Sequence, residues 1–161
     1  MNQMKIRALL PQDDAALASL IRKVLIEFDV PKTGTAYADP ELDQMYATYQ
    51  NPRMDFWVVL KGETILGGAG IAPLPKANAQ VCELQKMYFD PTARGLGMGA
   101  AMMDVCLDFA RQSGYKQVYL ETLPQMVHAQ KLYRKYGFQD LSNPMGDTGH
   151  CNCSVWMLKD L

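Results

Sequence analysis

The sequence predicts one α+β domain in which a mostly antiparallel sheet is followed by a short parallel strand pair, with helices flanking the sheet. Three observations predict it: apolar residues recur at helical spacing between residues 17 and 28, β-branched and aromatic runs fill residues 55–89, and a strand, helix, strand, helix order follows residue 90. The chain has 161 residues, an ordinary size for one domain, and no linker or repeat divides it. We therefore expect residues 1–161 to form a single domain.

The first half of the chain contains the predicted antiparallel strands. Residues 4–10, MKIRALL, predict a strand, and a helix follows because its apolar residues share one face. A shorter helix is expected around residues 42–49. Residues 55–75 predict a hairpin that turns at KGET, and residues 81–89 predict a third strand beside it. The apolar face of the long helix consists of Leu17, Leu20, Ile21, Val24, Leu25 and Phe28.

The second half changes to the pattern of a parallel pair. A glycine-rich loop leads into a helix that is expected to end near residue 113, because Gly114 is a typical helix-ending residue. Residues 117–122 predict a strand and residues 126–136 a second helix, which Gly137 ends. Two final strands complete the sheet.

The composition excludes several classes of protein. Hydrophobic residues make up 48% and charged residues 20%, which are ordinary values for a globular protein. A formal net charge of −1 without a basic run gives no support to nucleic-acid binding. No segment approaches the roughly 20 apolar residues of a membrane span, and the opening residues lack the apolar stretch of a signal peptide. We therefore expect a cytoplasmic protein that binds neither nucleic acid nor membrane.

The stretch ARGLGMGAAMM, residues 93–103, combines an arginine, three alternating glycines and the start of a helix. A helix N-terminus carries unpaired N–H groups and a partial positive charge, so it can hold an anion where glycines let the ligand approach the backbone. Arg94 adds a forked donor that suits phosphate oxygens. The alternative is that the glycines only form a tight loop and that Arg94 is a solvated charge.

The same glycines fit a second nucleotide-binding motif. Gly95, Gly97 and Ala100 satisfy G-x-G-x-x-G/A, and Glu121 closes a strand about twenty residues later, as in dinucleotide-binding folds. That motif normally follows the first, buried strand of a parallel sheet, whereas here several strands come earlier and the strand before the glycines carries Glu83, Gln85 and Lys86. A nucleotide-dependent oxidoreductase therefore remains an alternative enzyme class.

The segments ELQKMYFDPTARGLGMGAAMM and LYRKYGF together resemble the acetyl-CoA-binding core of the GNAT superfamily of N-acetyltransferases. The matching patterns are R-G-x-G-x-G/A at a helix start and L-Y-x-K-x-G-F at the end of a later helix. The resemblance is close over residues 83–138 and looser over the first eighty. It implies a GNAT-type fold, whose central sheet contains one splayed parallel pair, and transfer of an acetyl group from acetyl-CoA to a primary amine.

The resemblance also implies where acetyl-CoA binds. The N–H groups of residues 95–100 would hold the pyrophosphate beside Arg94, and main-chain groups of residues 87–89 would hold the pantetheine arm. Many family members carry an asparagine where this chain has Met126, so the neighbouring Gln125 is the candidate for that contact. The implied cofactor-binding residues are Met87, Tyr88, Phe89, Arg94, Gly95, Leu96, Gly97, Met98, Gly99, Ala100 and Gln125.

The reaction requires an acceptor amine without its extra proton, whereas a lysine-like amine has a pKa of about 10.4. Glu83 is the expected base, because its strand would run past the acetyl group; the alternatives are a solvent-facing glutamate or one paired with Lys86. His150, His128 or a water chain are the other candidates for the base. A backbone N–H near Met87 would polarise the thioester carbonyl.

The leaving thiolate would be protonated by an acid. Tyr133, in LYRKYGF, occupies the family position of that acid, and the alternative is a tyrosine that only packs in the core. A protein that binds acyl-CoA without catalysis, as a sensor, would keep the glycine loop but show no turnover.

The acceptor is expected to be a small molecule or a peptide or protein amine, bound by residues 34–42 and 144–150. Asp39, Glu41 and Asp43 would attract a cationic amine or remain solvated charges. The C-terminal stretch is similar to that of a bacterial subgroup of the family. The sequence is compatible with a homodimer. The segment HCNC, at residues 150–153, offers metal ligands but has no second cluster to complete a tetrahedral zinc site, so no metal is expected. Of the four cysteines, Cys82, Cys106, Cys151 and Cys153, most are expected to be small core residues.

Overall fold

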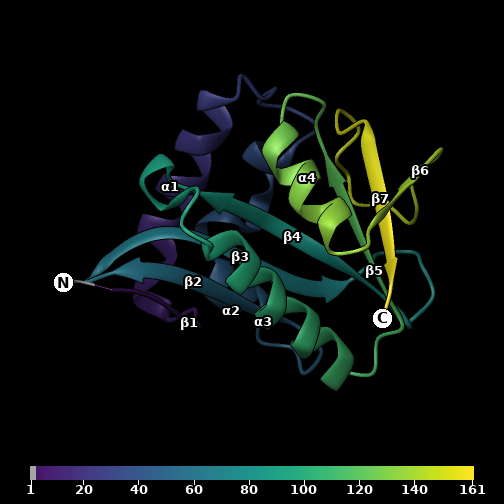
Figure 1. The fold of residues 1–161 in the computed structure, drawn as a ribbon, viewed down its shortest axis with the longest axis horizontal. Coiled ribbons are helices and arrows are strands. Elements are labelled where there is room, and N and C mark those ends of the chain that lie inside the picture. Colours follow the sequence, from purple (N-terminus) through teal and green to yellow (C-terminus); the bar gives the residue numbers. More distant parts are fainter. Residues whose placement is uncertain (1–2) are drawn as a thin grey trace.

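A single mixed sheet with helices on both faces organises the computed structural model, which describes residues 3–161 (Figure 1). Short 3-10 turns at Pro11–Asp13, Ala36–Ala38, Pro40–Asp43 and Pro91–Ala93 connect the main elements. The helices and strands are β1 (Met4–Ala8), α1 (Asp14–Glu27), α2 (Met45–Thr48), β2 (Asp55–Lys61), β3 (Thr64–Pro73), β4 (Val81–Phe89), α3 (Met98–Gln112), β5 (Gln117–Thr122), α4 (Val127–Lys135), β6 (Gln139–Leu141) and β7 (Val155–Asp160).

The strands follow the order β1-β2-β3-β4-β5-β7-β6, and within residues 3–161 β4 and β5 form the one parallel pair. The predicted α+β class, with its mostly antiparallel sheet and a single parallel pair, is confirmed. The parallel pairing is short, because it joins residues 81–83 to residues 117–119 and then stops. Beyond that point the two strands diverge, which opens the sheet in its middle (Figure 1).

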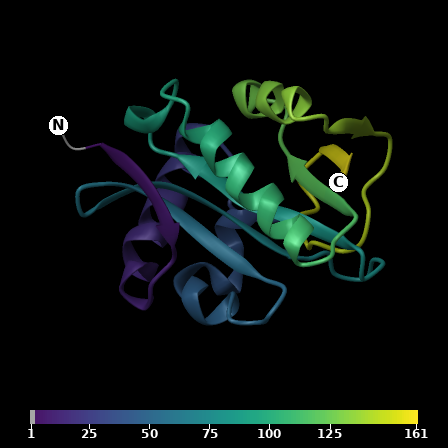
Figure 2. The same ribbon diagram turned by 60° about the horizontal axis from the view of Figure 1, so that its bottom comes forward.

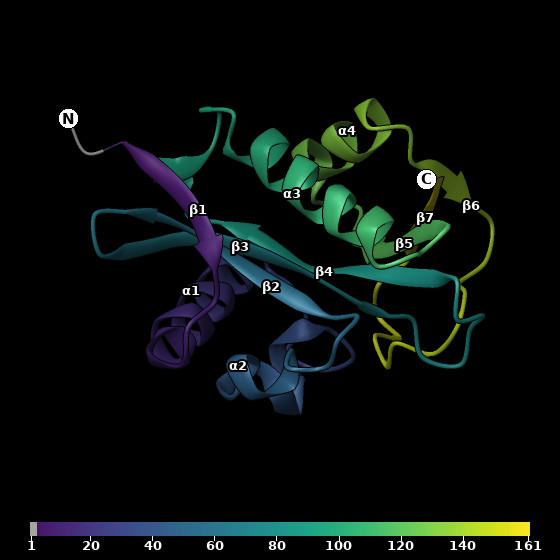
Figure 3. The ribbon, with the colours of Figure 1, turned by 90° about the horizontal axis from the view of Figure 1, so that it is seen from below.

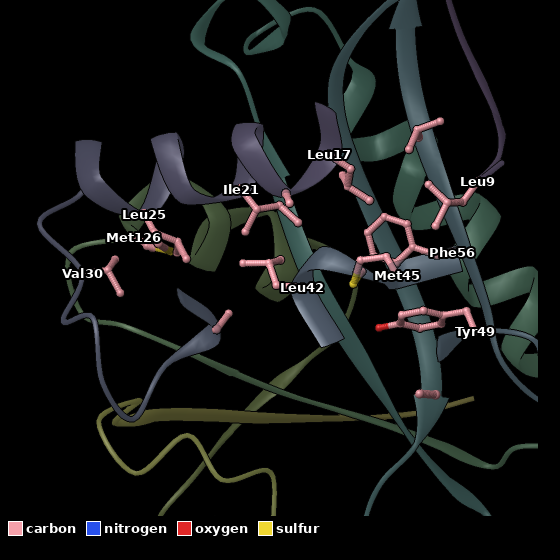
Figure 4. Close-up of a cluster of buried hydrophobic side chains, with 14 of the residues drawn as sticks. Leu9, Leu17, Ile21, Leu25, Val30, Leu42, Met45, Tyr49, Phe56 and Met126 are labelled. Carbon is pink, nitrogen blue, oxygen red and sulfur yellow. The ribbon is translucent and has the colours of Figure 1, made fainter. Parts of the chain in front are cut away.

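Two layers of helices enclose the sheet. Helices α3 and α4 lie on one face and α1 and α2 on the other (Figure 3), and α3 runs along the sheet beneath the glycine loop (Figure 2). The predicted apolar face of α1 is buried, apart from Phe28 at its end, which is half-buried. Figure 4 shows Leu17, Ile21 and Leu25 pointing from α1 toward Leu42 and Met45, so burial of this face fixes α1 on the sheet.

Strand β3 contains Gly67, Gly68 and Gly70, and glycines inside a strand ordinarily weaken it. It is nevertheless ten residues long and pairs on both sides. The rings of Phe56 and Phe89 lie directly over these glycines and leave no room for a Cβ atom. The glycines are therefore required by the aromatic packing.

Strand β4 carries a bulge that controls which side chains face each layer. Gly70 pairs with Gln85 and Gly68 pairs with Tyr88, so two residues of β4 oppose one residue of β3. Lys86, within the bulge, has a φ of 51°, in the left-handed region. The bulge reverses the alternation: Met87 and Phe89 pack with the α3 and α4 layer, while Tyr88 packs with the α1 layer.

Candidate active site

A cleft of about 660 Å³ lies where β4 and β5 diverge. Its walls are mainly apolar, and they come from the end of β4, the glycine loop and one face of α4, with further contributions from the end of α1 and from Met126 just before α4. The lining residues are Phe28, Met87, Phe89, Ala93, Arg94, Gly95, Gly99, Met126, His128, Ala129, Leu132 and Tyr133. The motif residues at the beginning and the end of the family resemblance therefore meet at one cleft.

The glycine loop presents an unbroken row of backbone donors beside this cleft. The N–H groups of residues 95–100 donate to no acceptor within residues 3–161, and the first helical bond of α3 runs from Ala101 N to Gly97 O at 3.0 Å. Gly95 and Gly97 have φ values of 71° and 81°, and the space where a Cβ would stand is open at both. The loop can therefore hold an anion against its backbone.

Arg94 lies at the edge of the cleft and is already paired. Its guanidinium donates to both carboxylate oxygens of Glu27, at 2.6 and 2.9 Å, and lies 5.1 Å from the centre of the Phe28 ring. Its Nε also donates to Phe89 O at 2.9 Å. The Arg94 hydrogen bonds lower the pKa of Glu27, which stays ionised at neutral pH. An incoming phosphate would therefore share Arg94 with Glu27 or displace it.

Tyr133 projects from α4 into the cleft. Its side chain is 6% exposed and its ring lies 6.0 Å from that of Phe138. Burial raises its pKa above the ordinary value of 10, and no hydrogen bond to the hydroxyl contributes to that shift. Tyr133 thus packs in the core and still faces the cleft. A packing role and the predicted role as an acid are therefore compatible.

A second cavity, of about 140 Å³, lies on the opposite face of the sheet opening. Met126, at the position of the family asparagine, lines both cavities and forms part of the wall between them. Gln125 lines neither cavity, and its amide donates to Phe28 O at 3.3 Å. The predicted acceptor segments, residues 34–42 and 144–150, both contribute to the smaller cavity.

Glu83 is buried at this cavity, with 5% of its surface exposed. Burial raises its pKa to about 7, although a hydrogen bond from Gln85 partly opposes the shift. The alternatives considered for Glu83 are not what the structure shows, because Glu83 is neither solvent-facing nor paired with Lys86. A carboxyl group that titrates near neutrality can take and release a proton during a reaction.

Lys86 instead belongs to an ion-pair cluster that links three segments. Its Nζ lies 2.7 Å from Asp39 Oδ2 and 3.1 Å from Glu41 Oε1, and its side chain is almost fully buried. His150 also contacts Asp39. Burial disfavours charge on His150, but the hydrogen bond and charge of Asp39 outweigh it and raise the pKa of His150.

Other acidic groups are distributed differently from the sequence expectation. Asp39 and Glu41 line the small cavity, whereas Asp43 lies at the surface in a bidentate pair with Arg22, at 2.6 and 2.8 Å. Glu121, at the end of β5, also lines the cavity and accepts a hydrogen bond from the Thr148 hydroxyl. Asp43 is therefore not part of the small cavity, whereas Glu121 joins Asp39 and Glu41 among its acidic residues.

The HCNC segment does not form a metal cluster. Cys151 is exposed, Cys153 is buried at the small cavity, and the His150 ring turns to Asp39. No group of three or more His, Cys, Asp or Glu suited to a metal occurs in the described part of the chain.

Between residues 3 and 161 no helix is long and apolar enough to cross a membrane.

Several site residues were not predicted from the sequence. Tyr49 contacts the site through Gln85, and Glu121 was read only as part of a nucleotide motif. His128 lines the large cleft, although it was only a weak candidate for the base, and Phe28 was read only as part of the α1 face. The alternation of side chains along β4 and β5 could have identified some of these residues. It places Glu83, Gln85 and Glu121 on the side of the sheet that faces the small cavity.

The fold and the site together define an acyltransferase of the acetyl-CoA-using kind: a splayed parallel pair, a donor-rich glycine loop and a buried carboxyl group beside the opening. The model of the "Acetyltransferase (GNAT) family" matches residues 22–138, and the chain belongs to this family.

Known relatives agree with this assignment. The chain is 40% identical to "Uncharacterized N-acetyltransferase YjgM" of Escherichia coli, over 97% of this chain and 94% of that protein. The structure is similar to a GNAT-family acetyltransferase of Staphylococcus aureus, with a TM-score of 0.86 at 19% identity, covering 98% and 99% of the chains. It is also similar to yncA of Salmonella typhimurium, described as a putative acetyltransferase with its cofactor acetyl-CoA, with a TM-score of 0.76 at 18% identity, covering 99% and 94%. The protein is an N-acetyltransferase by family.

Proposed function

We propose that the protein transfers the acetyl group of acetyl-CoA directly to a small cationic amine, with Glu83 as the base and Tyr133 as the acid. The observation that carries the proposal is the arrangement of the two cavities. Tyr133 lines the large cleft, Glu83 lines the small cavity, and Met126 lines both. The large cleft is the donor site and the small cavity is the acceptor site.

The residues around the large cleft suit acetyl-CoA. The unpaired N–H groups of residues 95–100 match the pyrophosphate, and the open space at Gly95 and Gly97 allows its close approach. The apolar walls at Met87, Phe89 and Leu132 suit a pantetheine arm. The edge of β4 beyond Glu83 does not pair with β5, so its main-chain groups are available to the arm.

Bound acetyl-CoA supplies an electrophilic thioester carbon, and the protein supplies the proton transfers. Glu83, with a pKa of about 7, is ionised in a large share of molecules at neutral pH and takes the proton of the acceptor amine, directly or through a water. A backbone N–H of β4 near Met87 would polarise the carbonyl oxygen.

Tyr133 would act at the sulfur atom of the donor. Since burial raises its pKa, Tyr133 keeps its proton throughout the neutral range and can donate it, or a hydrogen bond, to the leaving sulfur. Within residues 3–161 no hydrogen bond contributes to the pKa of this hydroxyl, which leaves it available for this role.

The small cavity favours a compact cationic acceptor. A volume of about 140 Å³ is comparable to cavities that hold a benzene-sized molecule, about six heavy atoms. Its cations are already matched, because Lys86 and His150 contact Asp39, whereas Glu83 and Glu121 have no cationic partner in the described chain. These charges support an amine without a carboxylate of its own; a lysine side chain of a peptide is the alternative acceptor.

The test combines binding with turnover. Calorimetric titration with acetyl-CoA and, separately, with a reduced nicotinamide dinucleotide distinguishes an acetyltransferase from an oxidoreductase that uses the same loop. A screen of short diamines, amino acids, aminoglycosides and lysine peptides then follows the release of free coenzyme A. We expect the diamines to give the highest kcat/KM. Binding of acetyl-CoA without turnover of any amine would favour a sensor and contradict the proposal.

A further inference from the structure

Glu83 is the end of a hydrogen-bond chain that begins next to α2. The Tyr49 hydroxyl donates to Gln85 Oε1, and Gln85 Nε2 donates to Glu83 Oε1. Tyr49 is 4% exposed, and its ring packs edge-on against Phe56 with centroids 5.2 Å apart. Figure 4 shows the Tyr49 ring below that of Phe56 in the buried cluster, with its oxygen directed away from Phe56. The chain therefore starts from a rigid residue.

The chemistry of the three groups fixes the direction of this chain. An ionised carboxylate only accepts hydrogen bonds, so the amide of Gln85 must turn its Nε2 toward Glu83 and its Oε1 toward Tyr49. The Tyr49 hydroxyl must then be the donor. Burial, together with the charges of Glu83, Glu41 and Asp39, raises the pKa of Tyr49 well above 10, so the hydroxyl keeps this proton.

Other charged groups near Glu83 form their contacts with other residues and do not replace Gln85 as the donor to its carboxylate. Lys86 of β4 is held by Asp39 and Glu41, His150 of the β6–β7 loop is held by Asp39, and Glu121 of β5 is held by Thr148. Their charges act on Glu83 from a distance, Lys86 and His150 favouring its ionised form and Glu121 opposing it. Within residues 3–161, Gln85 is the side chain that donates directly to the Glu83 carboxylate.

We propose that Tyr49 and Gln85 are positioning residues for Glu83: together they hold its carboxylate in one orientation toward the acceptor cavity. This inference rests on the proposed role of Glu83 as the base. Gln85 touches the carboxylate, and Tyr49 acts through Gln85 by preventing its amide from turning over. If the amide turned, its oxygen would face the carboxylate and repel it.

The test measures the titration of the Glu83 carboxyl group directly. Glutamate carboxyl carbons labelled with ¹³C are followed by NMR against pH, and the Glu83 signal is assigned by its loss in Glu83→Gln. Gln85→Met removes the donor with little change in volume and should raise the Glu83 pKa by about one unit, as expected for one hydrogen bond to a charged group. Tyr49→Phe should raise it by a smaller amount.

The double variant separates positioning from a general structural role. If Tyr49 acts only through Gln85, the Tyr49→Phe and Gln85→Met pair should shift the Glu83 titration no further than Gln85→Met alone. Tyr115→Phe is the matched control, because it removes another buried tyrosine hydroxyl, one that donates to Arg53 O at 2.8 Å, and should leave the titration unchanged. The acidic limb of the acetyl-transfer rate should move with the NMR titration.

Two titration results would each overturn the inference: Tyr49→Phe titrating like wild type, or shifts that add in the double variant. A fall in melting temperature without a change in the titration would also overturn it, since that result shows a purely structural role. Failure of the proposed function looks different. In that case Glu83→Gln would retain wild-type turnover, whatever the titration of the carboxyl group in the Tyr49 and Gln85 variants.

Discussion

His150 Nε2 lies 2.8 Å from Asp39 Oδ1 and 3.0 Å from Asp39 Oδ2, although the two residues are 111 positions apart in the chain. The contact joins the segment before α2 to the loop between β6 and β7 at the acceptor cavity. Because Asp39 also binds Lys86, one carboxylate holds two loops on β4. This ion pair makes the stability of the acceptor side dependent on pH.

The His150 contact should stabilise the protein more at low pH. The pKa of His150 is raised in the folded state, so its contribution is fully present below the unfolded value near 6.5 and is lost as the pH rises through the folded value. His150→Gln should therefore lower the unfolding free energy more at pH 5.5 than at pH 9, as measured by urea denaturation. His128→Gln, at an exposed position of α4, should show no such difference. An equal loss at both pH values would contradict the assigned ion pair.

The glycine loop can be tested with a closely matched control. Gly97 and Gly114 have φ values of 81° and 83°, and neither has an atom within 4 Å of the place of a Cβ. Alanine at either position adopts the same left-handed strain, which costs about 1–2 kcal/mol of stability. Only Gly97→Ala should also weaken acetyl-CoA binding, by about tenfold or more in Kd, because its methyl group stands at the proposed pyrophosphate site. Equal affinities in the two variants by calorimetry would remove that site.

A valine at Gly97 would be a poorer probe, since a β-branched residue is strongly disfavoured at positive φ. It would lower stability and binding together, so the two effects could not be separated.

Glu83→Gln should reduce turnover by about 10²-fold or more while acetyl-CoA affinity stays nearly constant, because the variant removes the proposed base and leaves the large cleft intact. In wild type the rate should rise with pH through about 7, as the carboxyl group ionises. Steady-state rates across pH, with the best amine of the screen, provide the measurement. Glu63→Gln, in the exposed turn between β2 and β3, is the control. Unchanged rates in Glu83→Gln would transfer the role to another group or to water.

The same substitution has a consequence for stability. Folding raises the pKa of Glu83 from about 4.5 to about 7, so the folded protein binds more protons than the unfolded chain in this window. Wild type therefore loses stability as the pH rises from 4.5 through 7, whereas Glu83→Gln lacks this loss. We expect the variant to gain stability relative to wild type between pH 5 and pH 8 in denaturant titrations. A constant difference would show that the carboxyl group is not buried as described.

Tyr133→Phe should keep both the fold and acetyl-CoA binding but slow the reaction. Within residues 3–161 no hydrogen bond contributes to the pKa of the hydroxyl, and the ring is kept, so the substitution should hardly change the melting temperature. The alkaline limb of the rate profile should shift or disappear, and the acidic limb, which reports Glu83, should remain. Rates equal to wild type at every pH would mean that Tyr133 only packs in the core.

Much of the fold could be predicted because periodicity reports burial. The α1 face, the hairpin and the parallel pair all appear at the expected places. Some elements end at other residues than expected. Strand β1 ends at Ala8, before the turn at Pro11–Asp13. The helix expected over residues 42–49 is limited to α2, because Pro40 begins a 3-10 turn.

The donor side of the site was easier to predict than the acceptor side. Residues 87–99 and 126–133 form the cleft as local motifs, each with its own recognisable pattern. The acceptor side joins Asp39, Lys86 and His150, which come from three distant segments, and no spacing along the chain reveals such a meeting. Sequence reasoning therefore identified the loops involved but not the pairing of their charges.

The bulge in β4 also limits how the chain can change in length. If the present residues of β4 alternated strictly, without the bulge at Lys86, Met87 and Phe89 would lie on the same face as Glu83. The lining of the donor cleft would then point into the acceptor side. Insertions in the loops that bear Asp39 or His150 can vary the acceptor without this effect, whereas one residue added within β4 would exchange inside for outside along the half of the strand that both proposed substrates share.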